Sequence, residues 1–121
     1  MKTVIVSLSP EARKVFEYLN QESEHSKTEK SILRAIKHKV NLLKMNPHYG
    51  DPLSKKLIPL EYIERYGITN LFRVELPNVW RMLYTLTEGD TKIEIIAFVL
   101  DIMNHKDYNK IFGYKNWLDK K

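Results

Sequence analysis

Hydrophobic residues change their spacing along the first 45 positions of the chain. Residues 3–8, TVIVSL, form a short apolar run that predicts a strand. Two groups of apolar residues then recur at the spacing of one helix face. These groups are Ala12, Val15, Phe16 and Leu19, followed by Ile32, Ile36, Val40 and Leu43. The pattern predicts a strand followed by a helical hairpin that lies on a sheet.

Polar residues mark the ends of the two predicted helices. Ser9 stands where an N-cap is expected, and Pro10 follows at the first helical position. Ser26 and Glu29 have the spacing of a capping box. The second helix should end before Asn46–Pro47, because a residue that precedes proline is driven away from helical geometry.

The second half of the chain reads as a loop followed by strands. Residues 46–59 are rich in Pro, Gly, Asn and Asp and predict a loop, and residues 60–67 predict a short helical turn. Three strands are predicted, over residues 70–76, 79–87 and 92–100. The last is apolar on both faces and should be an inner strand, and the tail from Asp101 predicts a loop and a short helix. The predicted order is β-α-α-β-β-β with a C-terminal helix. This is an α+β domain with the helical hairpin packed on a small, mainly antiparallel sheet.

Composition narrows the class of protein. The chain has 121 residues, which we interpret as one domain over residues 1–121, and it has no cysteine. No apolar run approaches the length needed to span a membrane, so we expect a cytoplasmic protein without a membrane partner. Twenty Lys and Arg against fifteen Asp and Glu give a net charge of +5, which favours anionic partners without naming one.

Two arginines stand in what otherwise reads as a buried hairpin. Side chains alternate along a strand, so Phe72 and Val74 share one face with Trp80, Met82 and Tyr84 only if the turn has an odd number of residues. A three-residue turn over residues 76–78 meets this condition.

That turn sets Arg73 directly opposite Arg81, and like charges opposite each other destabilise a sheet. Two interpretations follow. Either an anion lies between the two arginines, or both extend to water and Glu75 neutralises one of them.

Three stretches of the sequence resemble a known family. The stretches are NPHYGDPLSKKL, LFRVELPNVWRMLYTL and IEIIAFVLDIMNHKDYNKIFGY. In this order and spacing they resemble the RelE/ParE superfamily of toxins from type II toxin–antitoxin systems, in particular the RelE-like archaeal and bacterial branch. WRMLY, residues 80–84, is similar to the family's aromatic-Arg-φ-φ-Tyr motif at all five positions.

The resemblance implies a function. RelE-like members are endoribonucleases (mRNA interferases) that use neither metal nor cofactor, act on mRNA at the ribosome, and are neutralised by a cognate antitoxin, a small protein that we expect to be acidic. The alternative is a non-catalytic binding member of the same fold, either a ParE-like gyrase poison or a solitary relative that binds RNA or protein.

Site residues follow from the resemblance residue by residue. Arg81 matches the strand arginine that contacts the reacting phosphate, and Arg73 matches one of two lysines on the preceding strand. The second lysine falls at Glu75, which removes a cation. Tyr108 is similar to the C-terminal tyrosine of nuclease members. The arginine expected just before it is missing, and His105 and Lys106 stand nearest to its place.

These residue types suit metal-free cleavage of RNA. Arg73 and Arg81 are candidate cations for charge on phosphorus, and His105 has an ordinary pKa suited to proton transfer near neutrality. Tyr108 is a candidate base or a stacking platform, or it packs the C-terminal segment onto the sheet together with Phe112, Tyr114 and Trp117. Lys55, Lys56 and Lys106 are candidate contacts to the RNA backbone, with Lys55 and Lys56 equally readable as solvated charge.

Overall fold

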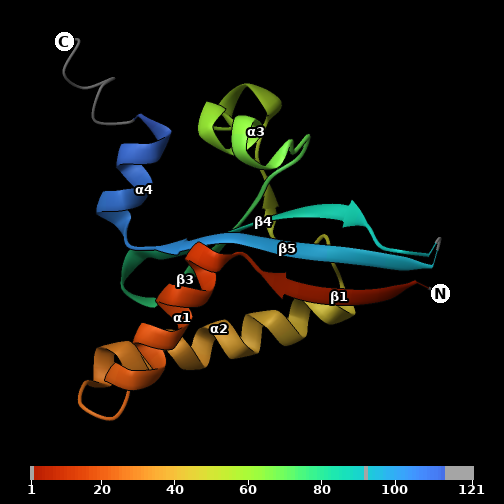
Figure 1. The fold of residues 1–121 in the computed structure, drawn as a ribbon. Coiled ribbons are helices and arrows are strands. Elements are labelled where there is room, and N and C mark those ends of the chain that lie inside the picture. The colour runs from red at the N-terminus through yellow and green to blue at the C-terminus, as the bar shows by residue number, and fades with distance from the viewer. Residues whose placement is uncertain (1, 92, 114–121) are drawn as a thin grey trace.

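The chain forms one five-stranded sheet with helices on both faces (Figure 1). The computed structural model describes residues 2–91 and 93–113. The helices are α1 (Pro10–Glu22), α2 (Lys27–Met45), α3 (Leu60–Tyr66) and α4 (His105–Phe112), with short 3-10 turns η1 (Lys55–Leu57) and η2 (Pro77–Val79). The strands are β1 (Thr3–Leu8), β2 (Asp51–Pro52), β3 (Phe72–Leu76), β4 (Trp80–Glu88) and β5 (Glu94–Met103).

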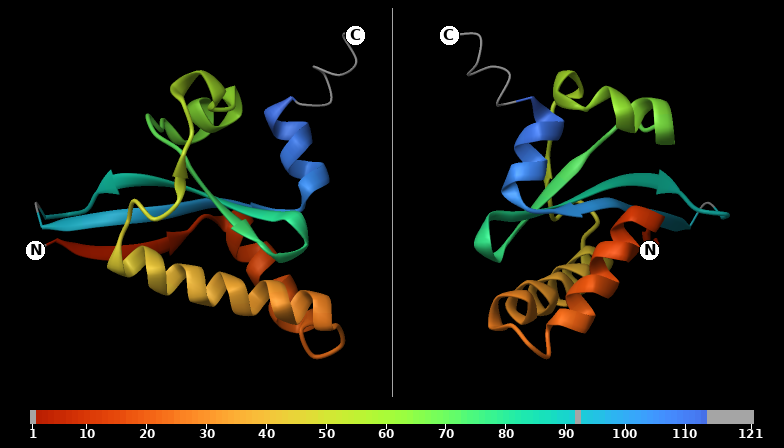
Figure 2. Two further views of the ribbon diagram at one scale, coloured as in Figure 1. Left: turned by 180° about the vertical axis from the view of Figure 1, so that it is seen from behind. Right: turned by 60° about the vertical axis from the view of Figure 1, so that its left-hand side comes forward.

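The sheet has the strand order β1-β5-β4-β3-β2. β1 runs parallel to β5, and the other neighbouring strands are antiparallel. The long hairpin of α1 and α2 covers one face, while α3 and α4 stand on the other (Figures 1 and 2). The α+β prediction and the inner position of the last strand are therefore confirmed.

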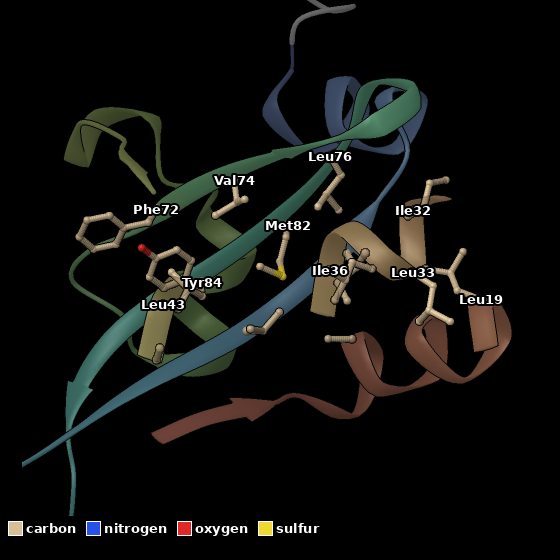
Figure 3. Packing of buried hydrophobic residues seen from close by; sticks show 14 residues of the cluster. Leu19, Ile32, Leu33, Ile36, Leu43, Phe72, Val74, Leu76, Met82 and Tyr84 are labelled. Carbon is tan, nitrogen blue, oxygen red and sulfur yellow. The ribbon is translucent and has the colours of Figure 1, made fainter. Parts of the chain in front are cut away.

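Side chains of α1 and α2 meet the even-numbered side chains of the hairpin in the larger core. Figure 3 shows this cluster from close by, with Ile36 and Leu43 of α2 toward Met82 and Tyr84 of β4. Both helices carry an apolar stripe that matches the spacing of one helix face, and this stripe is the side that they bury. The face predicted from strand alternation is confirmed, and Trp80 packs against the cluster while remaining partly exposed.

A second core lies on the opposite face of the sheet, beneath α3 and α4. Its buried residues are Ile58, Tyr62, Leu71, Leu83, Leu100, Met103 and Tyr108. The hydroxyl of Tyr62 donates to Asp101 of β5 at 2.6 Å, and Arg65 and Tyr66 both bind Glu11 of α1. These contacts hold α3 against the sheet, so α3 and α4 cover this face.

Ser9 joins the first helix to the inner strand. Its Oγ accepts a hydrogen bond from the amide of Ala12 at 3.0 Å, which confirms the predicted N-cap. The same hydroxyl donates to the carbonyl of Leu100 at 2.6 Å. Leu100 lies where the register between β4 and β5 shifts by one residue, and such a bulge frees backbone groups from the ladder. Ser9 satisfies one of these groups.

Two sequence predictions need correction. Residues 46–59, predicted as a loop, contain the short strand β2 and the turn η1. β5 continues to Met103, so residues 101–103 are strand rather than loop, and His105 is the first residue of α4. The predicted packing residues Tyr114 and Trp117 lie outside the described residues. No helix within residues 2–91 and 93–113 is long and apolar enough to cross a membrane.

Candidate functional site

The turn between β3 and β4 sets the register of the two arginines. It has three residues as predicted, but it comprises Pro77–Val79 and so lies one residue later than expected. Glu75 therefore pairs with Arg81, and Arg73 pairs with Leu83. The prediction that Arg73 lies directly opposite Arg81 is wrong. The two arginines are diagonal neighbours on one face, which is a less repulsive arrangement that still leaves them within reach of a common ligand.

Arg81 folds back onto this turn. Asn78 and Val79 have φ angles of 59° and 60°, a left-handed conformation that is unusual for a β-branched residue such as Val79. The Arg81 guanidinium donates through Nη1 to the carbonyls of Val79 at 2.8 Å and Trp80 at 3.3 Å. The arginine thus satisfies the carbonyl of Val79 in the turn and adds a longer hydrogen bond to the carbonyl of Trp80, a residue that pairs with Leu76 in the ladder.

Tyr108 of α4 joins the two arginines. Arg73 donates through Nη1 to the Tyr108 hydroxyl at 3.1 Å, and the Cζ of Arg81 lies 5.2 Å from the centroid of the same ring. Phe112, one turn further along α4, stacks on the Tyr108 ring at a centroid distance of 4.4 Å. The position follows from the chain path, because α4 begins right after β5, whose residue Met103 pairs with Arg81. Three of the four predicted catalytic residues are therefore brought together; we call them the arginine–tyrosine cluster.

Carboxylates contact the cluster only loosely. The Nη2 of Arg73 lies 3.9 Å from Asp51, and the Nη2 of Arg81 lies 3.7 Å from Glu75. Both carboxylate side chains are well exposed, at 69% and 65%, and exposed pairs of this kind contribute little to stability. The pKa of Arg73 is raised, first by its hydrogen bond to Tyr108 and then by the neighbouring negative charges. Both arginines are therefore cations whose acidic partners can swing into water.

Each arginine also keeps an unsatisfied donor. Among buried side-chain nitrogen and oxygen atoms of the described residues, two lack a hydrogen-bond partner: the Nε of Arg73 and the Nε of Arg81. A buried donor without a partner costs about 1–3 kcal/mol, and more when the group is charged. The two predicted phosphate-binding residues are thus the ones whose buried side-chain donors lack a partner in the described part of the chain.

The remaining predicted residues lie on the surface. His105 and Lys106 are exposed at the start of α4, and no hydrogen bond or ion pair in the described chain joins His105 to either arginine. Lys55 and Lys56 are exposed on η1, which lies between β2 and α3. Among the described residues these three lysines form no ion pair. The structure places them on the surface without joining them to the cluster.

The loop before β2 is tied to the sheet by Tyr84. Its hydroxyl accepts from the amide of Gly50 at 2.9 Å and donates to the carbonyl of Pro47 at 2.7 Å. A Cβ at position 50 would lie 2.8 Å from the Tyr84 ring, so only glycine allows this approach. Burial raises the pKa of Tyr84, which keeps its hydroxyl protonated and able to donate. Tyr84 of the strand motif therefore holds the loop motif in place through hydrogen bonds to Pro47 and Gly50.

A polar hollow of about 290 Å³ opens between this loop and the edge of β3. We call it the edge hollow. Its lining includes Lys39 of α2, Tyr49, Asp51, Arg73 and Glu75. Sequence reasoning missed Lys39 and Tyr49, because they stand ten positions apart on a helix and in a loop. No spacing rule connects two such elements.

Comparisons of the chain with protein-family models, with curated proteins and with solved structures find no match. In the part of the chain that the structure describes, no three His, Asp or Glu side chains gather in a group able to hold a metal ion. The chemistry of the candidate site therefore has to be argued from the arginine–tyrosine cluster itself.

Proposed function

We propose that this chain is a RelE-like toxin, a metal-independent endoribonuclease that acts on mRNA at the ribosome and is neutralised by a cognate antitoxin. The observation that carries the proposal is the arginine–tyrosine cluster, in which two cations with unsatisfied Nε donors surround one phenol. The order of elements and the helical hairpin on the sheet are consistent with the fold that the sequence resemblance implies.

A phosphate diester suits the unsatisfied donors. Arginine presents five N–H groups in a planar fork that matches two phosphate oxygens. The Nε atoms are covered by neighbouring groups, so binding requires each guanidinium to turn outward and release its exposed carboxylate, Asp51 or Glu75. In the proposed complex Arg73 and Arg81 hold one phosphate and satisfy both buried donors.

Cleavage then needs only the substrate's own 2′-hydroxyl as nucleophile. Its oxygen bonds to the adjacent phosphorus, the bond to the 5′ oxygen breaks, and a 2′,3′-cyclic phosphate and a free 5′-hydroxyl result. The two arginines stabilise the charge that gathers on the phosphate oxygens. In this proposal Tyr108, which accepts from Arg73 and lies beside Arg81, exchanges protons with the reacting oxygens.

The direct test uses purified protein, translating ribosomes and a defined mRNA. We expect cleavage that leaves a 2′,3′-cyclic phosphate on one fragment and a 5′-hydroxyl on the other, read by mass spectrometry of the ends. An mRNA with a single 2′-deoxy nucleotide before the cut should resist cleavage there. Fragments that carry a 5′-phosphate, or undiminished cleavage at the deoxy position, would contradict the mechanism.

A non-catalytic binding member of the same fold is the second candidate. The position of His105 favours it, because this histidine is exposed and makes no hydrogen bond to the arginines, which leaves Tyr108 to serve proton transfer at both oxygens. Glu75 favours it as well, since a carboxylate 3.7 Å from Arg81 weakens the attraction for phosphate. Stable binding to ribosomes or to gyrase without any cut would select this candidate.

The proposed antitoxin has a suitable surface. Two adjoining hollows of about 230 and 420 Å³ lie between α1 and α4 and share Val15, Ile102 and Met103 in their lining. Tyr18, which is 50% exposed, lies at one end of this groove, and Lys14 and Lys110 lie on its rim. The lining also contains Glu11, Asp101 and Asp107, so the apolar floor, and not the charge of the rim, is what fits the apolar face of an amphipathic helix.

Co-expression with the neighbouring genes tests the antitoxin proposal. We expect a small acidic protein to co-purify with this chain. Tyr18→Glu should weaken that complex at least tenfold, because it places a charge in the apolar groove beside the acidic partner. Arg34→Gln, at an exposed position of α2, serves as the control that leaves the groove intact. Purification of this chain alone from the native operon would count against the proposal.

A further inference from the structure

The edge hollow lies beside the last residues of β3, where β2 supplies no neighbouring strand. β2 has two residues, which pair with Arg73 and Phe72, and the chain before Asp51 turns toward α2 instead of continuing along β3. The amide of Leu53 binds the carbonyl of Leu71, so residues with the parity of Leu71 and Arg73 turn their backbone groups toward this edge. Glu75 has the same parity but lies past the end of β2. Its N–H and C=O therefore face the hollow rather than a neighbouring strand.

An aromatic ring stands over the other side of the hollow. Tyr49 is 40% exposed, and the Nζ of Lys39 donates to its hydroxyl at 2.8 Å while lying 5.1 Å from the ring centroid. Tyr49 also follows directly on the segment that Tyr84 ties to the sheet through Pro47 and Gly50. The ring is thus held in place and still exposed, as a platform for stacking must be.

The charges that line the hollow cancel. Lys39 and Arg73 supply two positive charges, and Asp51 and Glu75 supply two negative charges. The lining as a whole therefore carries no net charge that would select a phosphate for this hollow. A nucleobase is neutral, has two flat faces to stack, and carries donors and acceptors along its edge for backbone groups.

Arg73 belongs to both the hollow and the arginine–tyrosine cluster, because it lines the hollow while its Nη1 binds Tyr108. We propose that the edge hollow binds the base of a nucleotide that adjoins the phosphate held by Arg73 and Arg81. The base stacks on Tyr49 and its edge meets the N–H and C=O of Glu75. This inference rests on the proposed function, because it assumes that the adjoining phosphate belongs to RNA.

Binding of a non-cleavable RNA separates the hollow from the chemistry. The probe is a fluorescent 2′-O-methyl hexaribonucleotide, measured by anisotropy. Tyr49→Leu should weaken binding about 5-fold or more, because stacking of one base contributes about 1–3 kcal/mol. Tyr49→Phe keeps the ring and should stay within about twofold of the parent. Ile5→Ala, at an exposed position of β1 on the opposite edge of the sheet, should leave affinity unchanged.

The same hexamers with one abasic position test whether a base is the ligand. These probes keep every phosphate. The parent protein should bind the probe that lacks the base of the hollow at least about 5-fold more weakly than the intact hexamer. Tyr49→Leu should bind the two equally. If the parent binds RNA and Tyr49→Leu binds it equally well, the base site is refuted and the proposed function stands. If the parent binds no RNA, the base site is refuted, and the cleavage assay on translating ribosomes decides the proposed function separately.

Amide chemical shifts show which kind of ligand binds at the edge of β3. Titration with adenosine 5′-monophosphate should move the Glu75 amide signal in the parent and not in Tyr49→Leu. This result would support the base site even if no RNA were cut. The Glu75 amide signal could instead stay unchanged with the nucleotide and shift with an extended heptapeptide. That result would show that the edge of β3 binds an added strand, and it would overturn the inference.

Discussion

Arg81→Gln should lower the rate of mRNA cleavage about 100- to 1000-fold while the domain stays folded. An arginine that supplies charge and hydrogen bonds to a reacting phosphate acts in the transition state, and loss of one such donor typically costs this much. The side chain is 16% exposed and donates to Val79 and Trp80, so we expect about 1 kcal/mol of lost stability, the net contribution of such hydrogen bonds. The rate is measured on ribosomes with a defined mRNA.

Two controls make this result specific. Arg34→Gln removes the same charge from an exposed position on α2 and should leave the rate unchanged. Arg81→Lys keeps the charge but loses the planar fork and should recover only a small part of the rate. The salt dependence of RNA binding should flatten by about one phosphate contact in Arg81→Gln. Cleavage at the parent rate by a folded Arg81→Gln protein would remove this residue from the mechanism.

Leu83→Ala should lower the free energy of unfolding by about 3 kcal/mol or more. Leu83 is fully buried in the second core and pairs with Arg73 on β3. Truncation of a buried leucine removes its transfer free energy and leaves a cavity between the sheet and the helices above it. Urea unfolding followed by circular dichroism measures the loss.

Leu60→Ala provides the matched control for this truncation. Leu60 is 67% exposed at the first position of α3, so the same chemical change should alter stability by no more than about 0.5 kcal/mol. If Leu83→Ala cost as little as Leu60→Ala, the face that carries the arginines would be open to water. The cluster would then lack the low-dielectric surroundings on which its electrostatics depend.

Sequence features that span only a few residues were sufficient to predict where the two N-terminal helices lie and which strand faces are buried. Ser9 and Ser26 cap helices where their side chains were expected to, and the second helix ends at Met45, before Asn46, because Pro47 follows. Strand alternation placed Val74, Met82 and Tyr84 on the face that the helical hairpin covers. These predictions succeeded because capping, proline geometry and two-residue alternation depend on neighbours a few positions away.

The register of the hairpin was not a local property. Val79 adopts a left-handed backbone conformation that β-branched residues avoid, and this moves the turn one residue along the chain. The predicted and observed registers differ by two residues, which leaves Met82 and Leu83 on the same faces of the sheet, so strand alternation by itself could not choose between them.

The amino-acid sequence by itself thus determined the helical hairpin, the strand faces and the residue types available for chemistry, because each depends on local backbone preferences and side-chain spacing. Only the tertiary structure decided that α4 places Tyr108 between Arg73 and Arg81, and that Lys39 and Tyr49 stand over the free edge of β3. These juxtapositions join residues far apart in the chain. They arise from how the helices pack on the two faces of the sheet, which no local pattern encodes.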